Sequence, residues 1–174
     1  MPKERPTITS AAATPAGWSS ERSAELYGIN TWGAGYFDLS EQGEAQVNVD
    51  FGEHQVAVSI MDIVLGMRAR GLHMPAVLRI RNLLDHRIKL LNESFAQAIE
   101  QGGYQNTYRG VFPIKVNQQC HVIEEIADYG RRYHHGFEAG SKAELIIALS
   151  QLKDHDSLIV CNGYKDAEFI DLGL

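Results

Sequence analysis

The stretch "GVFPIKVNQQ", residues 110–119, reads as a buried strand that carries one charged residue near its end. It contains the β-branched and aromatic residues that a covered strand favours, namely Val111, Phe112, Ile114 and Val116. Lys115 is the exception, because a lysine that stays charged in an apolar environment carries a large desolvation cost. Its place in the run therefore needs a reason beyond packing.

A pattern of alternating strands and helices starts with this stretch, for which we predict a strand at 110–116. The later elements are predicted as a helix near 119–129, a strand at 135–140, a helix at 141–152, a strand at 157–162 and a helix from Asp166 onward. Strands separated by single helices indicate βα units around a parallel sheet. The periodicity fits a barrel and a doubly wound sheet equally well.

The sequence before this repeat has a different character. Residues 1–20 read as a disordered tail, since "MPKERPTITSAAATPAG" lacks the apolar stretch of a secretory signal. A transit peptide is a weaker alternative, because the tail contains Glu4 and little arginine. Residues 21–81 are predicted as a β-rich segment with a short helix and a strand, and residues 82–174 as the start of the parallel-sheet domain.

Local signals give the elements expected within this β-rich segment. The sequence is strand-like from Leu26 to Val49, with a hairpin turn at Ser40 to Glu44. A helix is expected within 58–71 and a short strand at 76–80. Asn82 is then expected to cap a long helix, with Asp85 complementing the positive end of the helix dipole.

Composition limits the class of protein. The 174 residues are 44% apolar and carry a net charge of −6, which disfavours a nucleic-acid partner. No apolar stretch approaches the ~18 residues of a membrane span, so no membrane partner is expected. The two cysteines, Cys120 and Cys161, suggest a reducing compartment, and we expect a cytoplasmic protein.

Two interpretations of Lys115 remain open from the residues alone. Alternation along the predicted strand places Lys115 opposite Ile114, near the carboxyl end, where βα folds carry their chemistry. The first interpretation is a surface lysine whose charge reaches solvent or pairs with a carboxylate. The second is a catalytic lysine whose amine reacts with an aldehyde. Pro113 cannot donate a ladder hydrogen bond, so it should lie at an irregular edge or before the regular strand.

Other polar residues follow the predicted strands. Glu138 ends the second strand and is interpreted either as a site residue or as a simple partner of Lys115. Ser141 and Glu144 form the pattern of a helix capping box, and Asn162 with Gly163 indicates a turn. Cys161 reads as a small buried apolar residue. The histidines His121, His134 and His135 show no metal-ligand spacing, and the adjacent pair reads as exposed loop residues.

Three longer motifs follow one another along the chain: "VFPIKVNQ" at 111–118, "GFEAGSKAEL" at 136–145 and "IVCNGYKD" at 159–166. Together they resemble the biosynthetic arginine decarboxylases. The earlier segments "YGINTWGAGYFDLSEQGEAQV" (27–47) and "HMPAVLRI" (73–80) are also similar to the N-terminal region of that family. The resemblance covers about residues 25–174, and three motifs in order with matching spacing are far more specific than any one of them.

The resemblance implies a fold, a cofactor and a reaction. The family uses pyridoxal 5'-phosphate on an alanine-racemase-like (β/α)8 barrel, and Lys115 matches the lysine that carries the cofactor. Glu138 matches an acidic residue close to that lysine. The implied reaction converts L-arginine to agmatine and CO2 for polyamine (putrescine and spermidine) synthesis, with pyridoxal phosphate as the electron sink. Dependence on Mg2+ and a homo-oligomeric full-length enzyme are implied in the same way.

The length suggests that the barrel is incomplete. A (β/α)8 barrel takes ~250 residues, whereas only three βα units follow residue 110. We therefore expect an N-terminal fragment of a longer enzyme, a truncated barrel that is inactive alone. The alternatives are a decarboxylase of ornithine or diaminopimelate, and a non-catalytic barrel protein that binds pyridoxal phosphate. Retention of Lys115 argues against an inactive homologue, and the long N-terminal region argues against a small single-barrel carrier.

Overall fold

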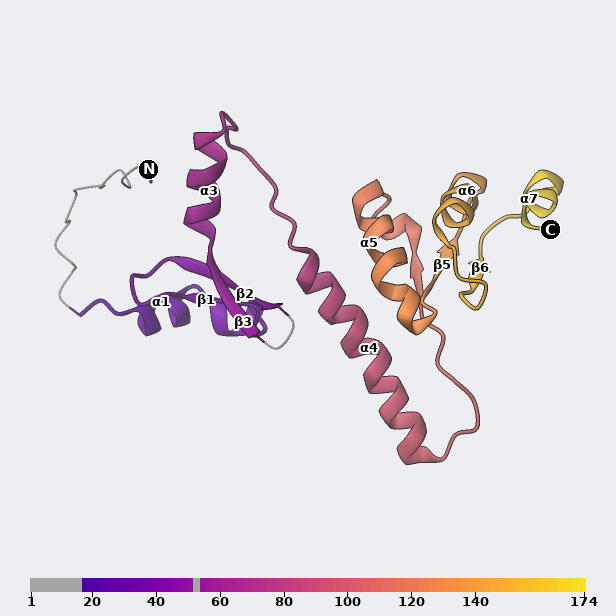
Figure 1. Cartoon of the computed structure of the whole chain (residues 1–174), viewed down its shortest axis with the longest axis horizontal. Coiled ribbons are helices and arrows are strands. Elements are labelled where there is room, and N and C mark those ends of the chain that lie inside the picture. Colours follow the sequence, from indigo (N-terminus) through magenta and orange to yellow (C-terminus); the bar gives the residue numbers. More distant parts are fainter. Residues whose placement is uncertain (1–16, 52–53) are drawn as a thin grey trace. The chain divides into compact units, whose positions relative to one another are not determined.

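The computed structural model describes residues 17–51 and 54–174, which form two units divided after Val77 (Figure 1). Most of the predicted tail, residues 1–16, lies outside the described residues. No helix in the described ranges is long and apolar enough to cross a membrane.

The first unit contains a three-stranded antiparallel sheet in the order β1-β2-β3. The strands are β1 (Phe37–Leu39), β2 (Ala45–Phe51) and β3 (His54–Ser59). The hairpin predicted at Ser40 to Glu44 is confirmed, with the Ser40 N–H donating to the Glu44 carbonyl at 2.8 Å. Strand β3 was not predicted, and "HQVAVS" shows no alternation of apolar and polar residues that would have indicated it.

Helices occupy part of the segment that read as strand. They are α1 (Ser20–Leu26) and α2 (Ile29–Trp32), so the prediction of strand from Leu26 onward is wrong before residue 37. The start of α1 has a side-chain cap, because the Ser19 hydroxyl accepts from the Arg22 N–H at 3.2 Å. The predicted helix within 58–71 is confirmed as α3 (Ile60–Ala69), which Ser59 caps in the same way.

The start of the second unit corrects two further predictions. Residues 76–80 form no strand and lead directly into the long helix α4 (Arg81–Gly102). The N-cap is Ile80, with no side-chain cap bond, and Asn82 lies inside the first turn. A short apolar run such as "AVLRI" does not distinguish a strand from an extended linker without knowledge of its partners.

A three-stranded parallel sheet forms the centre of the second unit, as predicted. Its order is β4-β5-β6, with β4 (Val111–Pro113), β5 (Gly136–Ala139) and β6 (Ile159–Cys161). The strands alternate with α5 (Cys120–Gly130), α6 (Lys142–Gln151) and α7 (Ala167–Gly173) (Figure 1). The core brings together buried residues of α4, α5, α6, β5 and the turn after β4: Ile88, Ile114, Ile123, Ile126, Phe137 and Ala148.

The end of β4 differs from the predicted strand at 110–116. The strand stops at Pro113 and continues as a single 3-10 turn, η1 (Ile114–Val116). Ile114 is fully buried whereas Val116 is 69% exposed, so the predicted alternation of faces through Lys115 is wrong. Pro113 is the last residue of the strand, which excludes a strand that starts after it.

Candidate functional site

Lys115 and Glu138 meet beyond the carboxyl ends of β4 and β5. Pro113 pairs with Glu138 in the sheet register, which places Lys115 just past the strand end beside the Glu138 side chain. The Lys115 Nζ lies 3.2 Å from Glu138 Oε1. The Glu138 side chain is 5% exposed and that of Lys115 is 59% exposed. A buried carboxylate therefore holds an amine that solutes can reach.

The second oxygen of Glu138 supplies a test of whether a cofactor fits here. Glu138 Oε2 is buried and has no hydrogen-bond partner among the described residues. Such an atom is rare, because a buried acceptor without a donor loses its solvation without replacement. A reachable primary amine next to a buried carboxylate with spare acceptor capacity suits a ligand that carries an aldehyde and a hydrogen-bond donor.

The loop after β5 is held by hydrogen bonds at the start of α6. The Ser141 hydroxyl accepts from the Glu144 N–H at 3.3 Å, and Glu144 Oε2 accepts from the Gly140 N–H at 2.8 Å. The predicted structural role of this pair at a helix start is thus confirmed, with the carboxylate bound one residue before the N-cap. A Cβ on Gly140 would lie 3.7 Å from Glu138 Oε1, at the edge of the site.

The turn after β6 lies against the same loop. The Asn162 N–H donates to the Ala139 carbonyl at 2.9 Å, and Gly163 has a φ of +78°. A Cβ on Gly163 would lie 2.8 Å from the Gly140 carbonyl oxygen, so this approach requires glycine. The chain bends at Gly163, where a turn was predicted for Asn162 and Gly163. Cys161 is half-buried and packs beside Ala139 and its neighbours, as a small apolar residue does.

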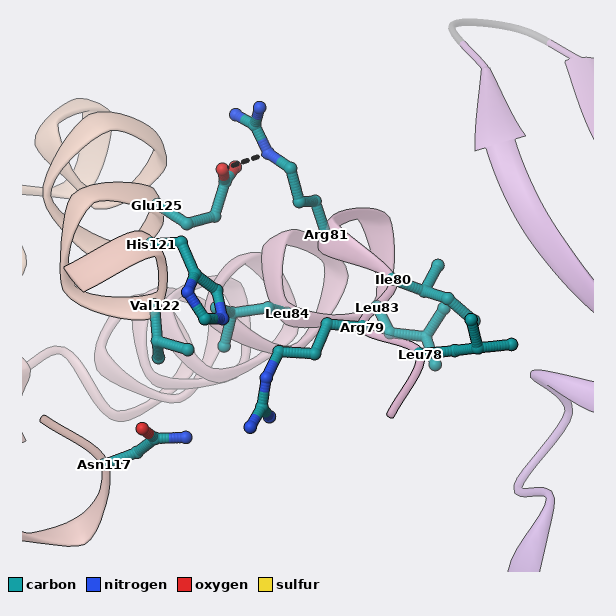
Figure 2. Close-up of a pocket in the computed structure, with 10 residues that line it drawn as sticks. All are labelled: Leu78, Arg79, Ile80, Arg81, Leu83, Leu84, Asn117, His121, Val122 and Glu125. Atoms are coloured by element: carbon teal, nitrogen blue, oxygen red, sulfur yellow. Dashed lines mark ion pairs between the residues drawn. The ribbon is translucent and has the colours of Figure 1, made fainter. Parts of the chain in front are cut away.

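A second polar network joins α4 to α5. Arg81 Nε forms an ion pair with Glu125 Oε2, shown as a dashed line in Figure 2, and Asp85 hydrogen-bonds to Glu125. Burial raises the pKa of Asp85 to about 7, and the bond to the Glu125 carboxylate adds to this rise. The sequence predicted only a dipole interaction for Asp85, because its partner lies on another helix.

The raised pKa of Asp85 predicts a pH dependence of stability. Between pH about 4 and about 7 the folded protein holds a proton that the unfolded chain has released. The free energy of unfolding should therefore fall as the pH rises through this window. Asp85→Asn should flatten that part of the profile and raise the melting temperature at pH 8. Thermal unfolding at several pH values tests this, with Glu100→Gln on the same helix as the control. An unchanged pH profile in Asp85→Asn would contradict the assignment.

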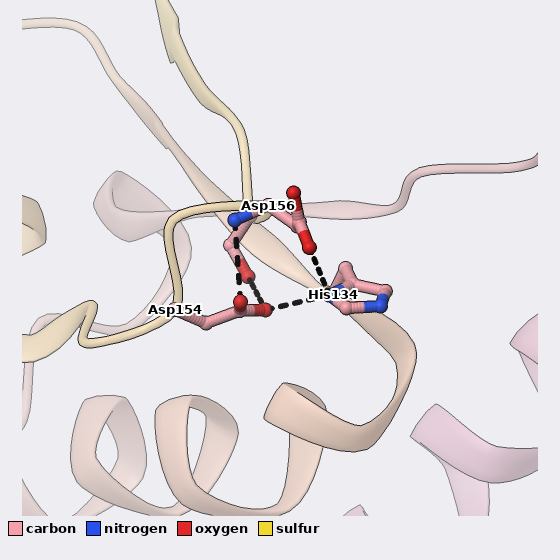
Figure 3. A network of polar contacts seen from close by, with 4 residues as sticks. His134, Asp154 and Asp156 are labelled. Atoms are coloured by element: carbon pink, nitrogen blue, oxygen red, sulfur yellow. Dashed lines mark hydrogen bonds and ion pairs between the residues drawn. The ribbon is translucent and has the colours of Figure 1, made fainter.

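A third cluster lies just before β5 and β6, and because the strands are parallel this is the opposite end of the sheet from Lys115. Figure 3 shows its members. His134, with a φ of +52°, places Nδ1 at 2.8 Å from Asp154 Oδ2, and this bond lowers the pKa of Asp154. The same carboxylate accepts from the Ser157 hydroxyl and from the Asp156 N–H. These bonds satisfy Asp154 and tie two loops together.

The cluster in Figure 3 was missed because its members lie far apart in the sequence. In the part of the chain that the structure describes, His134, Asp154 and Asp156 are the group whose ligand atoms, within 4.8 Å of one another, could share a metal ion. The prediction of exposed loop histidines is wrong for His135, which is buried and has its pKa lowered by burial. Gly110 makes room for its ring, since a Cβ there would lie 2.5 Å from it.

Comparison with known proteins places this geometry in a family. The model of the pyridoxal binding domain of pyridoxal-dependent decarboxylases matches residues 87–173. The chain belongs to this family. Lys115, Glu138 and the whole parallel sheet lie within the matched range.

Individual relatives give a consistent comparison. The chain is 45% identical over 157 residues to a biosynthetic arginine decarboxylase of Gloeobacter violaceus, covering 90% of this chain and 24% of the relative. It is 43% identical over 157 residues to a protein of the same name from Synechococcus sp., with the same coverage. The crystal structure of the biosynthetic arginine decarboxylase SpeA from Campylobacter jejuni matches 84% of this chain and 24% of its own, with a TM-score of 0.76 and 33% identity. The chain thus spans about a quarter of the length of these relatives.

Proposed function

We propose that this chain contributes the cofactor lysine to a pyridoxal-phosphate-dependent decarboxylase that converts L-arginine to agmatine and CO2 in polyamine synthesis. The observation that carries the proposal is the reachable Lys115 amine held by the buried Glu138 carboxylate in a pyridoxal binding domain. The names of the two relatives described above support arginine as the substrate.

Each of the two residues has a defined part in this proposal. Lys115 provides the primary amine to which the aldehyde of the cofactor attaches. Glu138 Oε1 contacts that amine, and its oxygen Oε2, which has no partner among the described residues, would be available to accept a hydrogen bond when the cofactor is bound. Pyridoxal phosphate, when bound, supplies an electron sink for the carbanion that remains after CO2 departs.

The sheet fits the first three strands of a (β/α)8 barrel. Its three parallel strands are adjacent in chain order, each followed by a helix, and Lys115 and Glu138 lie at their carboxyl ends, where barrel enzymes carry their sites. We propose that the remaining strands of the barrel are supplied by a further part of the enzyme, corresponding to the length of the relatives that this chain does not match. A homo-oligomer and a cytoplasmic location remain predictions.

Magnesium dependence also remains a prediction. The candidate metal cluster of the described residues includes the imidazole of His134, whereas Mg2+ prefers oxygen ligands. Removing divalent ions with a chelator and adding back Mg2+ during the assay tests the dependence directly.

Substrate choice can be tested in the enzyme that contains this chain. We expect CO2 release from arginine to exceed that from ornithine, lysine and diaminopimelate, because the relatives are named arginine decarboxylases. Parallel assays of the four amino acids, with agmatine identified by mass spectrometry, measure this. Enzyme freed of pyridoxal phosphate serves as the control and should regain activity when the cofactor is added. A preference for another amino acid would overturn the substrate, and activity without the cofactor would overturn the mechanism.

A further inference from the structure

A cavity of about 330 Å3 lies in the second unit between the starts of α4 and α5 (Figure 2). Its apolar lining includes Leu83, Leu84 and Val122. Polar side chains also border it, and in Figure 2 those of Arg79, Asn117 and His121 are directed toward one space. Neither Lys115 nor Glu138 lines this cavity, so it is separate from the proposed cofactor site.

Two of the polar groups have hydrogen-bond donors to spare. Arg79 forms no hydrogen bond or ion pair with any residue that the structure describes, and its guanidinium offers a planar fork of donors. The Asn117 Oδ1 accepts from the Gln119 N–H at 3.1 Å, which leaves the amide NH2 group as a donor. The cavity thus presents donors beside an apolar wall.

The charges around the cavity favour an anion. Glu125 is the acidic residue of its lining, and its carboxylate is already bound by Arg81 and Asp85. Arg79 is therefore left without a balancing carboxylate in that lining. Glu124 and Asp128 do not line this cavity, although they line a neighbouring hollow that Arg79 also borders, and neither forms an ion pair with Arg79 among the described residues. The cavity also lies at the positive ends of the α4 and α5 helix dipoles, which favour a negatively charged ligand. Neither helix start has a side-chain cap bond.

We propose that this cavity binds a small aliphatic carboxylate. Arg79 and the Asn117 amide hold the carboxylate oxygens, and the hydrocarbon body of the ligand packs against Leu84 and Val122. A carboxylate suits the site better than a phosphate dianion. The Arg79 guanidinium provides one positive charge that no acid of the lining pairs with, which matches a single negative charge, and much of the lining is apolar. The site goes beyond the proposed decarboxylase activity and does not depend on it.

Binding of 4-methylpentanoate to the holoenzyme that contains this chain tests the proposal. Isothermal titration calorimetry at low ionic strength should detect binding to the wild type and binding about tenfold weaker to Arg79→Gln, which loses a charge-assisted contact. Arg87→Gln, on an exposed part of α4, is the matched control and should bind as the wild type does. The neutral isostere 4-methylpentanamide should bind at least about tenfold more weakly than the carboxylate.

Crystals of the same holoenzyme soaked with 4-bromobutanoate locate the site. An anomalous bromine peak within this cavity, with the carboxylate at Arg79, is the expected result. Equal affinity of the wild type and Arg79→Gln would overturn the proposal, as would equal affinity for the acid and the amide. A peak confined to the Lys115 site, or a cavity filled by another segment of the enzyme, would overturn it as well.

Discussion

Replacing Lys115 with alanine should reduce kcat for decarboxylation by about 1,000-fold or more, because the change removes the amine that attaches the cofactor aldehyde. Lys115→Arg should be equally inactive, since a guanidinium stays charged and does not form the required bond. Lys115→Arg keeps a cation beside Glu138, so we expect it to melt close to the wild type. Lys115→Ala leaves the buried Glu138 carboxylate without its cation, so it should fold but melt at a lower temperature. Steady-state CO2 release together with thermal unfolding separates lost chemistry from lost structure.

A chemical label identifies the lysine independently of activity. Borohydride reduction of the holoenzyme followed by peptide mapping should place the pyridoxyl group on Lys115. Lys153→Ala, in the loop at the other end of the strands, serves as the control and should keep both label and turnover. A pyridoxyl group on another lysine, or full activity of Lys115→Ala, would refute the assignment.

Periodic features of the fold could be predicted from the sequence. The parallel sheet with its helices and the hairpin at Ser40 to Glu44 depend on local patterns of apolar residues, glycines and turn residues, and both are confirmed. The prediction of a strand at 76–80 was wrong for a physical reason. Five apolar and basic residues fit a strand, but a strand also needs a neighbour with free backbone groups, which no single segment reveals.

The candidate site was predictable only in part. Lys115 was noticeable as a charged residue in an apolar run. Glu138 was noticeable as an acidic residue near the end of the next predicted strand. Their 3.2 Å contact, however, depends on the sheet register and on the 3-10 turn after Pro113. The alternation rule failed at this point because the backbone leaves the extended conformation before Lys115. The partners of Asp85 and His134 were missed because they lie on other elements, Glu125 forty residues and Asp154 twenty residues further along the chain.

The backbone of the neighbouring strand lies so close to Gly136 that a side chain at this position would clash with it. The Gly136 N–H donates to the Gly110 carbonyl at 2.8 Å, and the next N–H, that of Phe137, donates to the Leu158 carbonyl at 3.0 Å. A Cβ on Gly136 would overlap the Leu158 carbonyl oxygen and would lie 2.8 Å from its carbonyl carbon. The overlapping atoms belong to the backbone, so no side-chain rotation relieves the clash.

Gly136→Ala should therefore lower the free energy of unfolding by about 3 kcal/mol or more, because β5 and β6 must separate to admit one methyl group. The matched control is Gly102→Ala in α4, where a Cβ would meet no atom within 4 Å. That change should be neutral or stabilising by up to about 1 kcal/mol, since alanine is the better helix former. Urea unfolding of both variants in the same enzyme measures the difference.

Gly136→Ala is also expected to disturb the Lys115–Glu138 site. Glu138 lies two residues after Gly136 on β5, so a displaced strand would move its carboxylate away from Lys115. Where Gly136→Ala enzyme can be purified, we expect weaker retention of pyridoxal phosphate on dialysis than in Gly102→Ala. Unfolding free energies of the two variants within about 0.5 kcal/mol of each other would show that the sheet can absorb the methyl group, and that the close approach of Gly136 to Leu158 does not constrain the site.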